Sequence, residues 1–223
     1  MQSPSTSKHI YYLVGVVVVS LLVLFHTDIN TEQRQTHSDS IEEPRAMPAQ
    51  RQRTTGERLI AKNMIAHWDD ISQVSAYVVQ FDGSSFISRQ VQISAVAATP
   101  SELNLVAMDY RCGFCKADQD NVEALMRAHP HHNFVFIESA ILGPGSIKLA
   151  ERAVSEASFN PQGYYAIHRR YLGGGVFQTA PASADAQVLV QTHLRIASEI
   201  RINTTPTYIV AGVPHVGTIT STY

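Results

Sequence analysis

Residues 103–116 read LNLVAMDYRCGFCK, and this stretch decides which fold the chain adopts. Its first half, residues 103–109, is a nearly unbroken apolar run, which is typical of a strand covered on both faces of a sheet. Its second half holds the only two cysteines of the chain, Cys112 and Cys115. The stretch therefore predicts a buried strand that ends where a Cys-Gly-Phe-Cys motif begins a helix.

The segments that follow the motif continue this pattern. Apolar residues recur at helical spacing up to Pro130, where the helix is expected to end, and a second buried strand is expected at residues 134–137. Strand, helix and strand in this order predict a βαβ unit with a right-handed crossover. The rest of the chain is expected to form three helices and a terminal antiparallel hairpin, at residues 147–157, 164–171, 184–202, 207–210 and 216–220.

The first 26 residues differ from a soluble domain. Residues 10–25 read IYYLVGVVVVSLLVLF, carry no charge and follow Lys8 and the amino terminus. This pattern favours an uncleaved membrane anchor at residues 1–26 over a cleaved signal peptide, because no Ala-x-Ala site follows. The positive charge ahead of the apolar segment predicts that the remainder of the chain is exported.

Residues 27–53 are rich in polar residues and are predicted to form a flexible linker, since they cannot bury enough apolar surface to fold. Residues 54–98 are predicted to form a helix and a hairpin. The helix is expected at about residues 56–70, capped by Thr55, and either packs on its own domain or forms a homodimer. The residues expected on its apolar side are Leu59, Ile60, Met64, Ile65 and Trp68.

The hairpin is expected to pair strands at residues 74–81 and 86–96, which carry β-branched and aromatic side chains. Residues 82–85, Asp-Gly-Ser-Ser, supply its turn. Residues 99–223 are expected to form the main domain. The net charge of −2 provides no basic field that would attract nucleic acid, so no nucleic-acid partner is expected.

Three roles are open for the two cysteines: a structural disulfide, half of a metal site or a redox centre. A disulfide that closes so short a loop removes little entropy from the unfolded chain. A zinc site needs four ligands, and His129, His131 and His132 are expected at the far end of the helix, so no metal is predicted. The amino end of a helix favours a thiolate at Cys112, and Cys115 is spaced to close a disulfide with it. Redox chemistry, with no organic cofactor, is therefore the favoured interpretation.

Aromatic and acidic side chains lie close to the two cysteines in the sequence. Tyr110 and Phe114 flank the motif and either shield the sulfurs and contact an unfolded protein, or simply pack in the domain. Asp118, Asp120 and Glu123 are interpreted as a polar face of the helix that follows the motif.

Three motifs in this order resemble those of a known family. They are DYRCGFCK at residues 109–116 after a hydrophobic strand, ILGPGS at residues 141–146, and TTPT at residues 204–207 before the last strands. Over residues 103–213 the chain resembles the DsbA-like thiol–disulfide oxidoreductases, which are thioredoxin-fold proteins with an inserted helical domain. The implied fold class is α/β, a thioredoxin-like domain at residues 99–223 with a helical insertion at about residues 141–202.

The resemblance also implies roles for single residues. Cys112 would be the exposed nucleophile and Cys115 the resolving cysteine. Pro206 would be a cis-proline beside the disulfide, and the backbone of Thr205 would pair with a bound client strand, with Phe114 as a further substrate contact. Two departures are visible: Val106 stands where many relatives carry a buried acid, and the sequence ends at Tyr223 where relatives continue into a closing helix.

The implied function is an extracytoplasmic protein thiol–disulfide oxidoreductase that forms or exchanges disulfides in exported proteins. A disulfide isomerase or reductase of the same fold, and a non-catalytic peptide-binding module, are the alternatives. The implied partners are reduced or unfolded exported proteins, a redox protein that regenerates the active form, the membrane through the N-terminal segment, and a second copy in a homodimer. The implied location is the bacterial inner membrane, spanned once, with the catalytic domain in the periplasm or outside the cell.

Overall fold

The computed structural model describes residues 52–175 and 180–219. The apolar segment at residues 10–25, in which a membrane anchor is predicted, and nearly all of the predicted linker lie outside these residues. Within the described part of the chain, no helix combines the length and the apolar character that crossing a bilayer requires.

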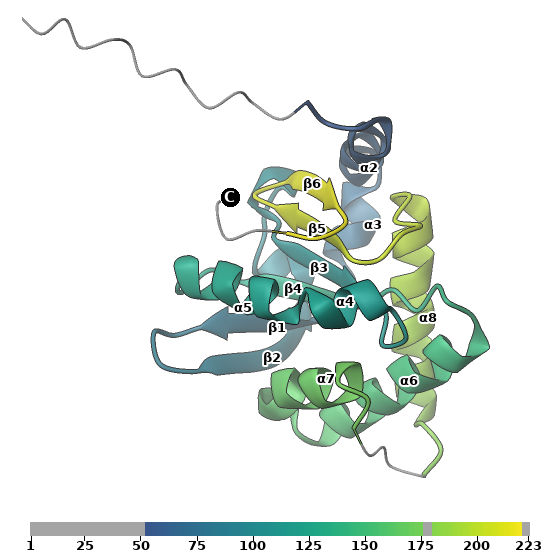
Figure 1. Ribbon diagram of the computed structural model, residues 1–223. Coiled ribbons are helices and arrows are strands. Elements are labelled where there is room, and N and C mark those ends of the chain that lie inside the picture. Colours follow the sequence, from purple (N-terminus) through teal and green to yellow (C-terminus); the bar gives the residue numbers. More distant parts are fainter. Residues whose placement is uncertain (1–51, 176–179, 220–223) are drawn as a thin grey trace, which may run out of the picture. The chain divides into compact units, whose positions relative to one another are not determined.

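A single six-stranded sheet organises the described residues, with the strand order β2-β1-β4-β3-β5-β6 (Figure 1). Only β3 and β4 run parallel to each other, and the other neighbouring strands are antiparallel. Every residue of β3 and β4 is buried, as the apolar runs predict for the centre of a sheet. The strands are β1 (Ser75–Phe81), β2 (Phe86–Gln92), β3 (Leu105–Met108), β4 (Phe134–Glu138), β5 (Thr207–Val210) and β6 (Val213–Val216).

The predicted βαβ unit is confirmed, but its helix is interrupted. Helix α4 (Gly113–Ala117) begins at the cysteine motif, and α5 (Gln119–Ala128) follows after a break at Asp118. Figure 1 shows α4 and α5 lying across the sheet. The terminal hairpin of β5 and β6 is also confirmed, although β6 lies at Val213–Val216 instead of the predicted residues 216–220.

The N-terminal part of the described chain forms two helices instead of the one predicted at residues 56–70. Helix α2 (Thr55–Ala66) ends at His67, and the short α3 (Trp68–Ser72) follows. The predicted cap was one residue late, since Thr54 caps α2 and forms a capping box with Glu57. The predicted apolar side is also incomplete, because Ile60 and Met64 are buried while Leu59 and Ile65 are exposed.

The predicted hairpin of β1 and β2 is confirmed, and its turn is held by the Asp82 carboxylate, which accepts hydrogen bonds from the backbone of Ser84 and Ser85. Because β1 also pairs with β4, the hairpin belongs to the same sheet as the cysteine motif. The predicted domain boundary near residue 98 therefore falls between strands of one sheet.

The helices after β4 complete two cores, one on each face of the sheet. The first core contains side chains of α4, α5, α6 and α7, and the second contains side chains of α2 and α3, with α8 contributing to both. The three helices expected after the βαβ unit are thereby confirmed. Their bounds are α6 (Pro144–Phe159), α7 (Tyr164–Leu172) and α8 (Ala184–Glu199), and single 3-10 turns lie at Ile93–Ala95, Pro100–Glu102 and Pro161–Gly163.

Candidate active site

The two cysteines lie at the carboxyl end of β3, where the chain turns into α4. Cys112 is the residue that caps α4, and its sulfur accepts a hydrogen bond from the backbone N–H of Cys115 at 3.2 Å. The backbone N–H of Cys112 donates to the carbonyl oxygen of Asp109 at 3.0 Å, which fixes the turn between strand and helix. The motif is thus placed at the start of a helix, as the sequence predicts.

The two sulfurs differ in their access to solvent. Cys112 is 6% exposed and Cys115 is fully buried, so the expectation of an exposed Cys112 is wrong, although Cys112 is the more accessible of the pair. Burial raises the pKa of the Cys115 thiol well above its ordinary value, while a backbone hydrogen bond from Asp109 acts in the opposite direction. A reagent from solvent therefore reaches Cys112 first, and Cys115 is held as a thiol.

The segment before β5 lies against Cys112. The peptide bond between Thr205 and Pro206 is cis, as the resemblance implies. The carbonyl oxygen of Thr205 is 3.4 Å from the Cys112 sulfur and accepts its S–H. Because β5 pairs with β3, residues 93 positions apart in sequence meet at this point. The structure thus brings together Cys112, Cys115, Thr205 and the cis-proline.

Exposed apolar side chains lie on the segments next to the motif. Phe114 is 73% exposed, and Ile141 and Leu142 are also exposed. The Asp109 carboxylate ties these segments together, since one oxygen accepts from the Arg111 N–H at 2.7 Å and the other from the Leu142 N–H at 2.9 Å. Of the two aromatic residues that flank the cysteines, Phe114 is therefore available to a partner, whereas Tyr110 packs in the core.

A cluster of buried polar side chains lies behind the motif and was missed in the sequence. The carboxylate of Glu138, at the end of β4, accepts hydrogen bonds from the hydroxyls of Tyr110 at 3.0 Å and Tyr164 at 3.1 Å. Burial raises the pKa of Glu138 to about 7, although these hydrogen bonds act to lower it. The Tyr110 oxygen also lies 3.1 Å from Nδ1 of His168, and burial lowers the pKa of this histidine to about 3.

Asp118 is a second buried acid, and its interpretation as part of a polar helix face was wrong. Its side chain is 1% exposed, whereas Asp120, two residues further on, is exposed. One carboxylate oxygen of Asp118 accepts from the Tyr208 hydroxyl at 2.6 Å and from the Ile219 N–H at 3.0 Å. The other accepts from the Asn121 amide at 2.6 Å. Two of its partners, Tyr208 and Ile219, lie near the end of the described chain, so the local sequence around Asp118 does not reveal them.

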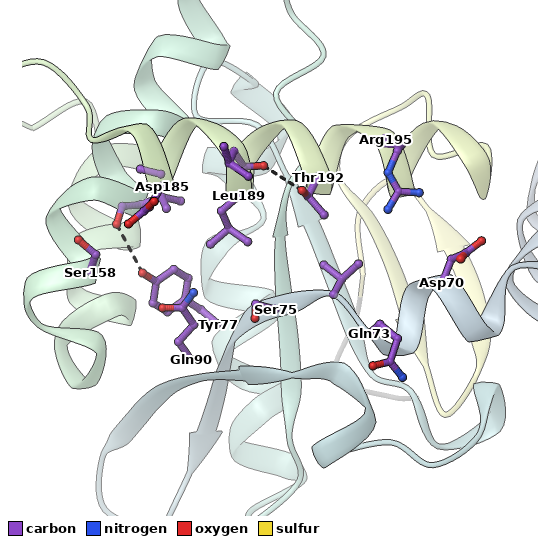
Figure 2. A pocket seen from close by; sticks show the side chains of 14 residues that line it. Asp70, Gln73, Ser75, Tyr77, Gln90, Ser158, Asp185, Leu189, Thr192 and Arg195 are labelled. Atoms are coloured by element: carbon purple, nitrogen blue, oxygen red, sulfur yellow. Dashed lines mark hydrogen bonds between the residues drawn. The ribbon is translucent and has the colours of Figure 1, made fainter.

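A separate cavity of about 610 Å³ lies between α8 and the beginning of β1 (Figure 2). Tyr77, Leu189, Thr192 and Arg195 are among the side chains that line it, and the Tyr77 hydroxyl donates to the Val154 carbonyl at 3.4 Å. No residue of the cysteine motif or of the Thr205 segment lines this cavity. It is therefore distinct from the cysteine site.

Among the described residues, one group of three side chains has the spacing of metal ligands. His67, Asp70 and Glu199 each offer one ligand atom, and these atoms lie within 4.8 Å of one another. However, Glu199 already pairs with Arg195 at 2.7 Å, and exposed carboxylates of this kind are common without a metal. None of the three residues belongs to the cysteine site.

Comparison with known structures identifies the fold. No family model matches the sequence, and no curated sequence matches it. Solved structures do match. One is the thiol-disulfide exchange protein alpha-DsbA2 from Wolbachia pipientis, with 15% identity, a TM-score of 0.54 and coverage of 75% of this chain and 93% of that chain. Another is the catalytic domain of ScsC from Proteus mirabilis, with 15% identity, a TM-score of 0.54 and coverage of 72% of this chain and 92% of that chain.

The described residues therefore form a mixed α/β domain with a thioredoxin-like fold and inserted helices. More specifically, the fold is that of the DsbA-like thiol–disulfide exchange proteins, as the resemblance in sequence predicts. At these identities, the likeness establishes the fold, and the activity has to be argued from the site itself.

Proposed function

We propose that this protein exchanges disulfides with other proteins through Cys112 and Cys115. The arrangement of the two sulfurs carries this proposal: a reachable cysteine caps α4, a buried cysteine lies one turn further, and the Thr205 carbonyl stands against the first sulfur. The shared fold with structures described as thiol-disulfide exchange proteins supports it.

In the oxidising direction, the reaction begins when a client thiolate attacks the Cys112 sulfur of the Cys112–Cys115 disulfide. The bond between the two protein sulfurs breaks, and Cys115 leaves with the electron pair and takes up a proton. A second client thiolate then attacks the client sulfur of the mixed disulfide, so that the client disulfide forms and Cys112 leaves as a thiolate. Two electrons pass from the client to this protein, and a partner protein carrying a disulfide must accept them to restore the active form.

Client binding is proposed to use the surface around Cys112. Phe114, with the neighbouring exposed side chains of Ile141 and Leu142, offers apolar contact to an unfolded chain. The backbone of Thr205, which precedes β5, is proposed to pair with an extended client segment as an added strand. Such contacts would select unfolded proteins by their exposed backbone and apolar side chains.

The proposed location is outside the cytoplasm, where oxidising conditions allow the disulfide to form. The predicted anchor at residues 10–25 would tether the domain to the inner membrane with its active site on the exported side. Dimer formation through α2 stays a prediction, and sedimentation of the full chain in detergent tests it.

The test of the proposed function counts disulfides formed in a reduced, unfolded protein that has several cysteines. The full chain, purified in mild detergent and oxidised, is expected to introduce disulfides in proportion to the amount added, and Cys112→Ala is expected to introduce none beyond the uncatalysed background. Equal performance by the variant would contradict the proposal and would favour a non-catalytic peptide-binding module.

A second substrate separates the activities within this class. A protein with scrambled disulfides regains activity only when its disulfides are reshuffled, so rescue by the reduced chain would identify an isomerase. Net loss of disulfides from this client would identify a reductase. Net gain of disulfides in a reduced client treated with the oxidised chain, without rescue of the scrambled client, would identify an oxidase, which is the activity that we expect.

A further inference from the structure

We infer that Asp118 and Tyr208 form a buried relay that takes the proton of Cys115 when this cysteine resolves a mixed disulfide. The inference deepens the proposed function and rests on it, because the proton of Cys115 has to move only if Cys115 takes part in exchange. The observation behind it is a buried carboxylate three residues after a fully buried thiol, hydrogen-bonded to a buried phenol that packs in the same core as the thiol.

Solvent has no direct access to the proton of the buried Cys115 thiol. Cys115 is fully buried, and burial raises the pKa of its thiol well above the ordinary value. Only the thiolate attacks a disulfide, so the proton must leave before or during the attack. The strand that leads to the motif offers no acid or base, because Val106 occupies the core position there.

Asp109, Tyr110 and Cys112 come shortly before Cys115 in the chain, and each has an ionisable side chain. The carboxylate of Asp109 accepts hydrogen bonds from backbone N–H groups, which cannot pass a proton on, whereas the carboxylate of Asp118 accepts from a hydroxyl, which can. The hydroxyl of Tyr110 faces the other way, toward Glu138 and His168. Cys112 is itself the sulfur under attack. The carboxylate of Asp118, with the Tyr208 hydroxyl, is what remains.

The fold places this pair from two sides of Cys115. Asp118 follows Cys115 by three residues, so it lies on the same side of the helical turn. Tyr208 comes from β5, where it is the strand partner of Val106, and its ring packs in the same core as Cys115. Burial raises the pKa of Tyr208, and so does its hydrogen bond to Asp118.

The hydrogen bonds within the pair fit a proton acceptor. The Tyr208 hydroxyl donates to Asp118 at 2.6 Å, a distance typical of O–H···O⁻ hydrogen bonds. The Ile219 N–H and the Asn121 amide also donate to the carboxylate, which fixes its position. Asp118 is thus held as an acceptor for the proton of the Tyr208 hydroxyl.

The Cys115 proton passes to the Tyr208 oxygen while the Tyr208 proton passes to Asp118. The Cys115 thiolate attacks the Cys112 sulfur of the mixed disulfide, a bond between the two cysteines forms, and the bond from Cys112 to the partner sulfur breaks. The partner leaves as a thiolate with the electron pair. In the opposite direction, the same groups return the proton to Cys115.

A single-turnover reaction with glutathione disulfide separates the two steps. Reduced full-length protein is mixed with excess glutathione disulfide and quenched with acid at a series of times, and mass spectrometry then counts the reduced, glutathionylated and oxidised forms. Attack by Cys112 produces the glutathionylated form, and attack by Cys115 removes it.

Asp118→Asn keeps the size and an acceptor oxygen but removes the base, and Tyr208→Phe keeps the ring but removes the hydroxyl. Both variants are expected to form the glutathionylated species at the wild-type rate and to resolve it at least about tenfold more slowly, since general acid–base catalysis is typically worth more than this. Asp120→Asn, which changes an exposed carboxylate two residues away, is the matched control and is expected to behave as the wild type.

The pH profile distinguishes proton transfer from a loss of structure. In both variants, resolution is expected to accelerate about tenfold per pH unit because only hydroxide from solution is left to remove the proton, whereas the wild type has a flatter profile near neutrality. A variant that slows both steps equally, or that resolves at the wild-type rate, would overturn the inference. If Asp118→Asn fails to fold, Tyr208→Phe decides alone by the same criteria.

The reaction with glutathione disulfide also tests the relay separately from the proposed function. Slow resolution in the variants supports the relay even if the wild type introduces no disulfides into unfolded proteins, in which case only the proposed client class fails. A wild type that never forms the species glutathionylated at Cys112 would overturn the relay and the proposed function together.

Discussion

Replacement of Cys115 by alanine is expected to stop the exchange reaction at its covalent intermediate, whereas replacement of Cys112 is expected to prevent that intermediate from forming. Cys112 is the more accessible sulfur and forms the bond with the client, and Cys115 is needed to release it. When each reduced variant is mixed with an unfolded protein that carries one activated disulfide, Cys115→Ala should hold most of its molecules in an adduct and Cys112→Ala should hold almost none.

Non-reducing electrophoresis measures this adduct directly, and peptide mapping identifies the sulfur involved. The wild type, which can resolve the intermediate, should show only a trace. The expected loss of transfer rate in Cys112→Ala is at least about a hundredfold, as for removal of other nucleophiles. Equal adducts on both variants would show that the two sulfurs are equivalent and would contradict the roles assigned here.

Replacement of Glu138 by glutamine is expected to change how stability depends on pH. The pKa of Glu138 is raised by burial from 4.5 to about 7, so between these values the folded state binds a proton that the unfolded state has lost. The stability of the wild type therefore falls as pH rises through this window. Relative to Glu138→Gln, which does not ionise, the wild type should lose about 3 kcal/mol of unfolding free energy between pH 4.5 and pH 7.

Denaturant titrations of both proteins at several pH values give this difference. Burial lowers the pKa of His168 to about 3 and of His193 to about 4, so both proteins should also lose stability as pH falls below about 6.5. This contribution is common to the two proteins and cancels in the difference. Glu151→Gln on α6 is the matched control, and a difference for Glu138→Gln that does not vary with pH would contradict the prediction.

The central part of the fold was predictable because its signals are local. A short, nearly unbroken apolar run a few residues before Cys-Gly-Phe-Cys predicted β3 and α4, and the same kind of apolar pattern predicted β4 and the helices after it. The predicted cap of α2 was one residue late, although the capping-box spacing distinguishes the two threonines: Thr54 has glutamate three residues later and Thr55 does not.

Other features depend on contacts between distant residues. Asp118 carries no mark of burial in the sequence, because its partners Tyr208 and Ile219 lie about ninety or more positions away. Similarly, Glu138 ends an apolar strand, but its burial follows from the hydroxyls that α7 and the segment before the motif bring to it. The predicted position of β6 was wrong because it left out Pro214, since proline disfavours the interior of a strand. The observed β6 contains Pro214 because it lies at the edge of the sheet, where proline is tolerated.

The central claim is that Cys112 and Cys115 form one reversible two-electron couple, and equilibration of the full chain with mixtures of reduced and oxidised glutathione tests it most directly. Acid quenching and mass spectrometry give the fraction that has lost two hydrogen atoms at each ratio. We predict a single reversible transition between the dithiol and the internal disulfide, at a potential within the range of about −270 to −120 mV spanned by proteins of this fold. A protein that stays in the dithiol form at every ratio, or that ends as a stable glutathione adduct on either cysteine, would contradict the claim.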